Sequence, residues 1–275
     1  MPHQTILIIG SSGFLGRQIT SLCELQASII KTHCRNPLYP DSIRYDFFND
    51  AIEKLLDIQK IDIVIFAGMV ETSPLDAVQT SMQRFAKACR DKRVIYLSSD
   101  GVFDGQKGFY AEQDAPNSQT LYGQNLAACE KIIAKHCQNF CIVRPSYIYG
   151  FSNGKLDDRL TKTIETLKAG EKVTLFDDMF KSPYGVKQIA NAVIALARSA
   201  LTGIIHVAGQ RMSVYEFHRQ AMSALMVDTT NLKSCKMPTA KGYLRDTSLD
   251  SSMWQNITNS KLENIQDILA AKDAA

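Results

Sequence analysis

The chain has 275 residues, of which 45% are hydrophobic and 21% are charged, and its net charge is +3. This length suits one large domain, or one domain with a smaller lobe, and the composition is typical of soluble globular proteins. The weak charge excess argues against a nucleic-acid partner. No apolar run reaches the roughly 18 residues that span a bilayer, so we expect no membrane partner either.

The seven cysteines are odd in number and include no CxxC pair. This usage is typical of a reduced protein with free thiols, so we expect a cytoplasmic location. Cys137 and Cys141 have helical spacing, but His136 is their only neighbouring candidate ligand. We therefore expect no metal site.

Strand-like and helix-like segments alternate along the first 150 residues. Apolar runs predict strands at residues 5–9, 28–33, 61–66, 93–97 and 140–143. Helical patterns lie between them, at residues 49–57, 75–90 and 121–136. Such alternation requires crossover connections, so we expect a parallel sheet with helices on both faces. Ligands of such sheets bind beyond the C-terminal ends of the strands.

After residue 150 the pattern changes and indicates a smaller unit. We expect helices at residues 157–169, 189–200 and 213–226, and strands at 173–176 and 203–207. We assign residues 1–150 and 186–208 to a nucleotide-binding domain, and 151–185 and 209–275 to a lobe that closes over the ligand. The long loop at residues 105–117 is expected to help close that site.

A glycine-rich turn joins the first strand to the first helix. Its glycines allow a sharp turn and a close approach of ligand, and the helix N-terminus presents free N–H groups to a pyrophosphate. A simple strand-to-helix turn would not explain the third glycine. The predicted cofactor residues here are Gly10, Ser11, Ser12, Gly13, Phe14, Leu15 and Gly16. Phe66, Ala67 and Gly68, at the end of the strand at residues 61–66, are also assigned to the cofactor.

The residues after the second strand favour NADP over NAD. NAD-binding folds usually place a carboxylate about 20 residues beyond the glycines, and residues 32–35 contain none. Arg35 is placed to bind a 2′-phosphate, although an exposed loop arginine is the simpler alternative. Asp46 is assigned to the adenine, with an isolated loop aspartate as its alternative.

Several motifs together resemble one family. GSSGFLG at residues 10–16 resembles the glycine motif of extended short-chain dehydrogenases/reductases. LSSDGVFDG at 97–105, RPSYIYG at 144–150 and RDTSLD at 245–250 are similar to the dTDP-4-dehydrorhamnose reductase branch. The resemblance runs from residue 5 to about residue 252, with the motifs in order.

This resemblance implies a Rossmann-type doubly wound parallel sheet with a small C-terminal α/β substrate lobe. It implies NAD(P)H-dependent reduction of the 4-keto group of a nucleotide-sugar. Its catalytic positions fall on Ser99, Asp100 and Tyr122, and Tyr122 also meets the cofactor. The phenol would protonate the carbonyl oxygen, and the serine hydroxyl would hold that oxygen. Implied substrate-binding residues are Val102, Phe103, Tyr149 and Arg245.

One departure from the family pattern leaves the activity open. The family has a lysine four residues after the tyrosine, on the same helix face, and this chain has Leu126 there. A modified reductase would take its electrostatics from Asp100, a water or Lys181. A non-catalytic NADP-binding subunit would resemble the regulatory beta subunit of methionine adenosyltransferase. A nucleotide-sugar epimerase or dehydratase is a further alternative, and a homodimer or a regulatory partner remains open.

Overall fold

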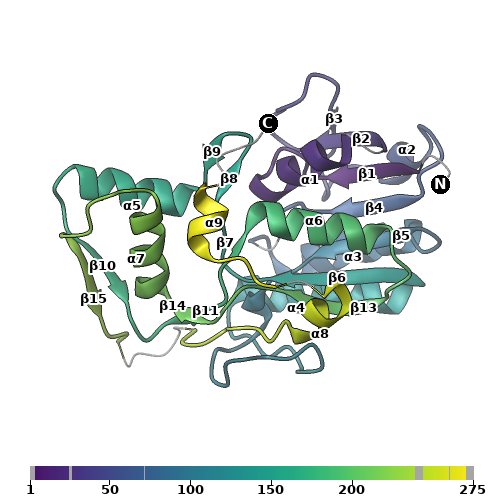
Figure 1. The fold of residues 1–275 in the computed structure, drawn as a ribbon. Helices are drawn as coiled ribbons and strands as arrows, with labels where there is room; N and C mark the ends of the chain where they lie inside the picture. The colour runs from purple at the N-terminus through teal and green to yellow at the C-terminus, as the bar shows by residue number, and fades with distance from the viewer. Residues whose placement is uncertain (1–3, 25–26, 71, 239–243, 260, 271–275) are drawn as a thin grey trace.

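The computed structural model describes residues 4–24, 27–70, 72–238, 244–259 and 261–270. Within them, a seven-stranded sheet has the order β13-β6-β5-β4-β1-β2-β3, with every pairing parallel (Figure 1). Its strands are β1 (Thr5–Ile9), β2 (Ser28–His33), β3 (Ile43–Arg44), β4 (Ile63–Phe66), β5 (Arg93–Leu97), β6 (Asn139–Pro145) and β13 (Gly203–Val207). The predicted doubly wound α/β fold is confirmed.

Helices cover both faces of this sheet, as Figure 1 shows. α1 (Phe14–Glu24) packs beside α6 (Val186–Ala197) on one face, and α3 (Leu75–Ala88) packs beside α4 (Leu121–His136) on the other. Alternate residues of β1 face opposite clusters, Ile6 and Ile8 in one and Leu7 and Ile9 in the other. A strand buried on both sides needs an uninterrupted apolar run, which is why this sequence pattern predicted the sheet. The short α2 (Glu53–Leu56) and the 3-10 turn η1 (Asp100–Val102) lie in connections.

The second lobe lies beside the sheet domain, at the left of Figure 1. Its helices are α5 (Asp158–Lys168) and α7 (Val214–Ala224), and β10 (Val173–Phe176) pairs with β15 (Leu232–Cys235). The remaining short strands are β7 (Ile148–Tyr149), β8 (Phe151–Ser152), β9 (Lys155–Leu156), β11 (Phe180–Lys181), β12 (Tyr184–Gly185) and β14 (Met212–Ser213). Two-residue strands are too short to give a periodic pattern, so the sequence did not predict them.

Two segments make contacts with distant parts of the chain. α8 (Ser252–Thr258) contacts β13, and the Ser251 hydroxyl donates to Ala208 O, so this stretch returns to the main sheet. Only the last described helix, α9 (Ile265–Ala270), lies against the lobe helix α7. The loop at 105–117 is bound to the C-terminal segment, with Tyr110 N donating to Ser248 O at 2.9 Å. Its backbone groups are thereby satisfied away from the cavity described below.

The described cysteines are free thiols, and most lie in the core. Among the described helices, none is both long enough and apolar enough to cross a bilayer.

A buried ion pair ties α4 to β6, because Arg144 Nη2 lies 2.6 Å from Glu130 Oε2 and neither side chain reaches solvent appreciably. Ser98 donates to the same glutamate at 2.6 Å. The end of β5 is therefore fixed to α4.

Two buried histidines make the stability of the fold dependent on pH. Burial, with a smaller effect of Arg144, lowers the pKa of His206 from 6.5 to about 4. Burial, with a smaller effect of Arg159, lowers the pKa of His218 to about 4. Between these values and 6.5 only the unfolded chain takes up the protons, so stability falls as pH falls through that window. Each histidine is expected to cost about 1.4 kcal/mol of unfolding free energy between pH 7.5 and 5.5.

Urea denaturation at the two pH values measures this loss. His218→Gln should lower the difference by about half. Equal stability of the wild-type protein at pH 7.5 and 5.5 would contradict the assignment.

Candidate active site

The glycine turn after β1 brings three backbone segments into close contact. Gly10 has φ +84°, and a Cβ placed on it would lie 2.8 Å from the backbone of Gly68. A Cβ on Gly16 would lie 2.0 Å from Gly10 O. Only glycine fits at these two positions, because the first needs left-handed backbone and both lack space. The end of β1, the end of β4 and the start of α1 thus form one cradle.

Some polar groups in this cradle stabilise the turn itself, and others lie at a cavity. The buried Ser11 donates to Thr32 O at 2.9 Å, which ties the turn to β2. Ser12 Oγ is buried with no hydrogen-bond partner among the described residues, and Ser12 and Phe14 line a cavity. The first turn of α1 holds no acidic residue, and its leading N–H groups, such as that of Leu15, have no partners within the helix, while Gly13 N before it donates to Gly10 O at 3.1 Å. The cradle therefore fits the pyrophosphate of a dinucleotide.

The residues assigned to the adenosine end lie at the edge of the sheet. Arg35 follows β2, is exposed, and makes no ion pair or hydrogen bond with other described residues. Asp46 shapes its own turn, accepting from Asn49 Nδ2 at 2.9 Å and from Phe48 N at 3.0 Å. The bond from Asn49 is the main cause of the lowered pKa of Asp46. Arg35 is thus available to a ligand, whereas the Asp46 carboxylate is already engaged.

A cavity of about 660 Å³ extends from the glycine turn to the second lobe. This volume lies within the range of roughly 300–1,000 Å³ of small-molecule sites. It opens at the C-terminal ends of β1, β5 and β6, where a parallel sheet binds its ligand. Its lining residues are Ser12, Phe14, Arg17, Ser98, Ser99, Asp100, Tyr122, Pro145, Tyr147, Ile148, Lys155, Asp157, Asp158, Arg159 and Lys181. The three predicted catalytic residues are therefore in one cavity with Ser12 and Phe14.

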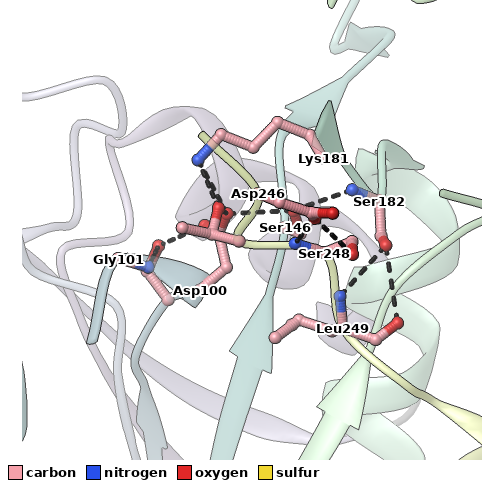
Figure 2. A network of polar contacts seen from close by, with 10 residues as sticks. Asp100, Gly101, Ser146, Lys181, Ser182, Asp246, Ser248 and Leu249 are labelled. Carbon is pink, nitrogen blue, oxygen red and sulfur yellow. Dashed lines mark hydrogen bonds and ion pairs between the residues drawn. The ribbon is translucent and has the colours of Figure 1, made fainter. Parts of the chain in front are cut away.

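Asp100 is the centre of a polar network, which Figure 2 shows from close by. Lys181 Nζ lies 2.9 Å from Asp100 Oδ2, and Ser99 Oγ lies 2.9 Å from Asp100 Oδ1. The hydroxyls of Ser146, at 3.2 Å, and Thr247 also bond to Oδ2. These partners come from β11, from the turn after β6 and from the C-terminal segment. Distant parts of the chain therefore meet on one carboxylate.

The charges of this network determine which atoms donate. Burial by itself would raise the pKa of Asp100, but the Lys181 ammonium and hydrogen bonds from Thr247, Lys181 and Ser99 outweigh it, so the pKa is lowered. An ionised carboxylate only accepts hydrogen bonds, so the Ser99 hydroxyl is the donor. Ser99 Oγ in turn accepts from Gly101 N at 3.1 Å. In this arrangement Ser99 could accept a hydrogen bond from a ligand, but its proton is already donated to Asp100.

Tyr122 begins α4 at the wall of the cavity. Thr120 caps the helix, accepting from Gly123 N at 3.1 Å, and the Tyr122 ring lies against Gly101. A Cβ on Gly101 would come within 2.7 Å of that ring. One turn further along, Leu126 is 1% exposed and packs in the hydrophobic core. The position of the missing lysine is thus filled by a core side chain.

The predicted substrate residues do not gather at the cavity. Val102, Phe103 and Tyr149 are buried in the core, where Tyr149 packs on Phe217. Arg245 is paired with Asp178 at 2.6 Å, outside the cavity lining. None of these four side chains lines the cavity. In the LSSDGVFDG motif, the apolar residues Val102 and Phe103 therefore belong to the core cluster that also contains residues of the sheet.

Several lining or supporting residues were missed by the sequence reasoning. Thr247 lies in the RDTSLD motif, where the arginine was chosen instead. Ser146 and Tyr147 lie in the RPSYIYG motif, and Tyr147 has φ +46°, an unusual backbone for a non-glycine residue. Arg17 directly follows the last glycine and lines the cavity, but no pattern distinguished it.

A family model described as the RmlD substrate binding domain matches residues 4–272. The chain belongs to this family. A probable low-salt glycan biosynthesis reductase of Haloferax volcanii is 26% identical, covering 98% of this chain and 97% of that protein. The beta subunit of methionine adenosyltransferase 2 of Danio rerio is 25% identical over 85% of this chain and 76% of its own length.

A solved structure with the same fold is that of a dTDP-4-dehydrorhamnose reductase from Bacillus anthracis in complex with NADP. Its TM-score is 0.81, its sequence identity is 19%, and 98% of each chain is covered. The family and the fold expected from the motifs are thus confirmed.

The close contact at Gly16 predicts a loss of stability on substitution. Gly16→Ala should lower the thermal unfolding temperature, because the added methyl meets backbone at 2.0 Å. We expect a cost of more than about 1 kcal/mol, although alanine favours helices by a similar amount. Gly68→Ala is the matched control, because its Cβ would meet only side chains, at 3.5 Å or more. Equal unfolding temperatures of the two variants would contradict the cradle geometry.

Proposed function

We propose that this protein is an NADP-dependent reductase of a keto group in a nucleotide-activated deoxysugar, as the dTDP-4-dehydrorhamnose reductases of the same fold are named. The observation that carries this proposal is the shared cavity. It joins Ser12 and Phe14 of the dinucleotide cradle to Ser99, Asp100 and Tyr122. A cofactor held by the cradle and a substrate held by the second lobe would meet in it.

The cradle residues support NADP as the cofactor. Ser12 and the first N–H groups of α1 would bind the pyrophosphate, and Arg35 would bind the 2′-phosphate. NAD remains the alternative, without the contact to Arg35. When bound, the nicotinamide supplies a hydride, which no side chain of the protein can provide.

The proton would come from the protein itself. Tyr122 is 39% exposed and lines the cavity, where its phenol could meet a carbonyl oxygen. The phenol gives its proton to that oxygen as general acid and is reprotonated from water. Arg17, Lys155 and Arg159 also line the cavity and would provide cations for the substrate diphosphate. The arrangement therefore orients a nucleotide-sugar with its sugar toward Tyr122.

A second candidate function is non-catalytic binding, as in a regulatory subunit. It is favoured by Leu126, which leaves α4 without the lysine typical of the family, and by the likeness to a methionine adenosyltransferase beta subunit. Turnover of a keto-sugar separates the two candidates, because a binding subunit would retain NADPH affinity without consuming the cofactor.

Removal of the phenolic hydroxyl tests the proton donor. Tyr122→Phe should lower kcat by about a hundredfold or more, because general acids contribute roughly 10²–10⁴ in rate. The measurement is NADPH oxidation with a dTDP-4-keto-6-deoxysugar. Binding of NADPH, followed by fluorescence, should be retained. Equal kcat values for wild type and variant would remove Tyr122 from the mechanism.

Arg35 should discriminate between the two nicotinamide cofactors. Arg35→Ala is expected to weaken NADPH binding by about 10- to 100-fold, because a charge-assisted contact to the 2′-phosphate is lost. NADH lacks that phosphate, so its affinity should be unchanged and serves as the internal control. Titration calorimetry measures both constants. An unaltered NADPH affinity would show that Arg35 does not bind the phosphate.

A further inference from the structure

Lys181 reaches the cavity from the second lobe and not from α4. It ends β11, which pairs with β14, and Phe180 before it bridges to Asp246. Arg211 fixes this strand further, because its guanidinium lies 3.6 Å from the Phe180 ring centroid and 2.8 Å from Asp246. The backbone of Lys181 is thus held on two sides. Its side chain crosses to the sheet domain, as Figure 2 shows.

The Lys181 ammonium uses two of its three N–H donors within the described residues. Nζ donates to Asp100 Oδ2 at 2.9 Å and to Thr247 Oγ1 at 2.6 Å. An ammonium carries three N–H donors, and the third has no partner among the described residues. The side chain is 12% exposed and lines the cavity beside Ser99 and Tyr122. A largely buried cation with an unused N–H therefore faces the place where the sugar would bind.

We propose that Lys181 is a catalytic residue that donates its third N–H to the sugar oxygen undergoing reduction. This inference rests on the proposed reductase function. Lys181 thereby fills the role of the cation that α4 lacks at Leu126. Ser99 cannot supply this donor while its proton is bonded to Asp100.

The pairing with Asp100 decides which step Lys181 assists. In the resting site the carboxylate balances the ammonium, so a neutral carbonyl gains little from it. During reduction the carbonyl carbon gains a hydride from the reduced nicotinamide, and the C=O π pair moves onto the oxygen. The oxygen then takes the Tyr122 proton, while Lys181 keeps its own protons. Lys181 thus contacts a charge that grows as the reaction proceeds, which raises kcat more than it lowers KM.

Substitution of Lys181 tests this separation of kcat from KM. Lys181→Met should lower kcat by about a hundredfold or more, as loss of an oxyanion donor does, with KM within about threefold. Lys31→Met is the matched control, because Lys31 is a buried lysine paired with Glu24 and Asp41 outside the cavity. It should retain wild-type kcat. A Lys181→Met variant that is folded by circular dichroism and retains wild-type kcat would overturn the inference.

A double variant separates this role from charge balance alone. Lys181→Met leaves Asp100 buried without its cation, whereas Lys181→Met with Asp100→Asn leaves no charge to balance. If the N–H of Lys181 is needed, the double variant is as slow as Lys181→Met. Recovery of kcat in the double variant, toward that of Asp100→Asn alone, would reduce Lys181 to a structural counterion and overturn the inference.

A binding measurement distinguishes failure of this inference from failure of the proposed function. If the wild-type protein does not turn over the keto-sugar, the proposed function fails. Calorimetry with dTDP-rhamnose and with dTDP then decides the inference. A loss of affinity in Lys181→Met for the sugar nucleotide, by up to about threefold, but not for dTDP, supports a contact from Lys181 to the sugar. Equal changes for both ligands overturn it.

Discussion

The buried carboxylate of Asp100 is the group on which the two parts of the molecule depend. A charge out of contact with water is costly unless it is paired and hydrogen-bonded. Here the pairing comes from the lobe strand β11, and the hydrogen bonds come from Ser99, Ser146 and Thr247. Removal of any of these segments would leave the carboxylate partly unsatisfied. The sheet domain and the lobe are therefore joined through the candidate site itself.

The glycine cradle shows a second constraint, of space and not of charge. β1, β4 and α1 approach each other so closely at Gly10 and Gly16 that no side chain fits. This closeness places the N-terminus of α1 and the Ser12 hydroxyl, which has no partner among the described residues, on the same cavity as Tyr122. Backbone geometry thus fixes the N-terminus of α1 at the cavity, and the Asp100 network fixes the side chains of Ser99 and Lys181 there.

Local patterns predicted the parts of the fold that depend on neighbours in sequence. β2 and α4 have the bounds expected from their apolar runs and helical periodicity, and α7 lies within the expected helix at 213–226, with Ser213 as its cap. The Asp100 network depends instead on residues 46, 81 and 147 positions away in the chain. Contacts between residues this far apart leave no local pattern in the sequence. Motifs indicated that Ser99, Asp100 and Tyr122 act together, but the motif neighbours Val102 and Phe103 are core residues.

The replacement at position 126 is explained by packing. The Leu126 side chain lies among the core residues between α4 and the sheet, where an ammonium would lose its hydration without gaining a partner. A largely buried lysine is stable where a carboxylate and a hydroxyl accept its hydrogen bonds. At the cavity, Asp100 and Thr247 are these acceptors. Lys181 has these partners, and it comes from β11 instead of α4. Lys155 and Arg159 line the same cavity as Lys181, so under the proposed function three of the cations at the cavity come from residues 155–181 and one, Arg17, comes from α1.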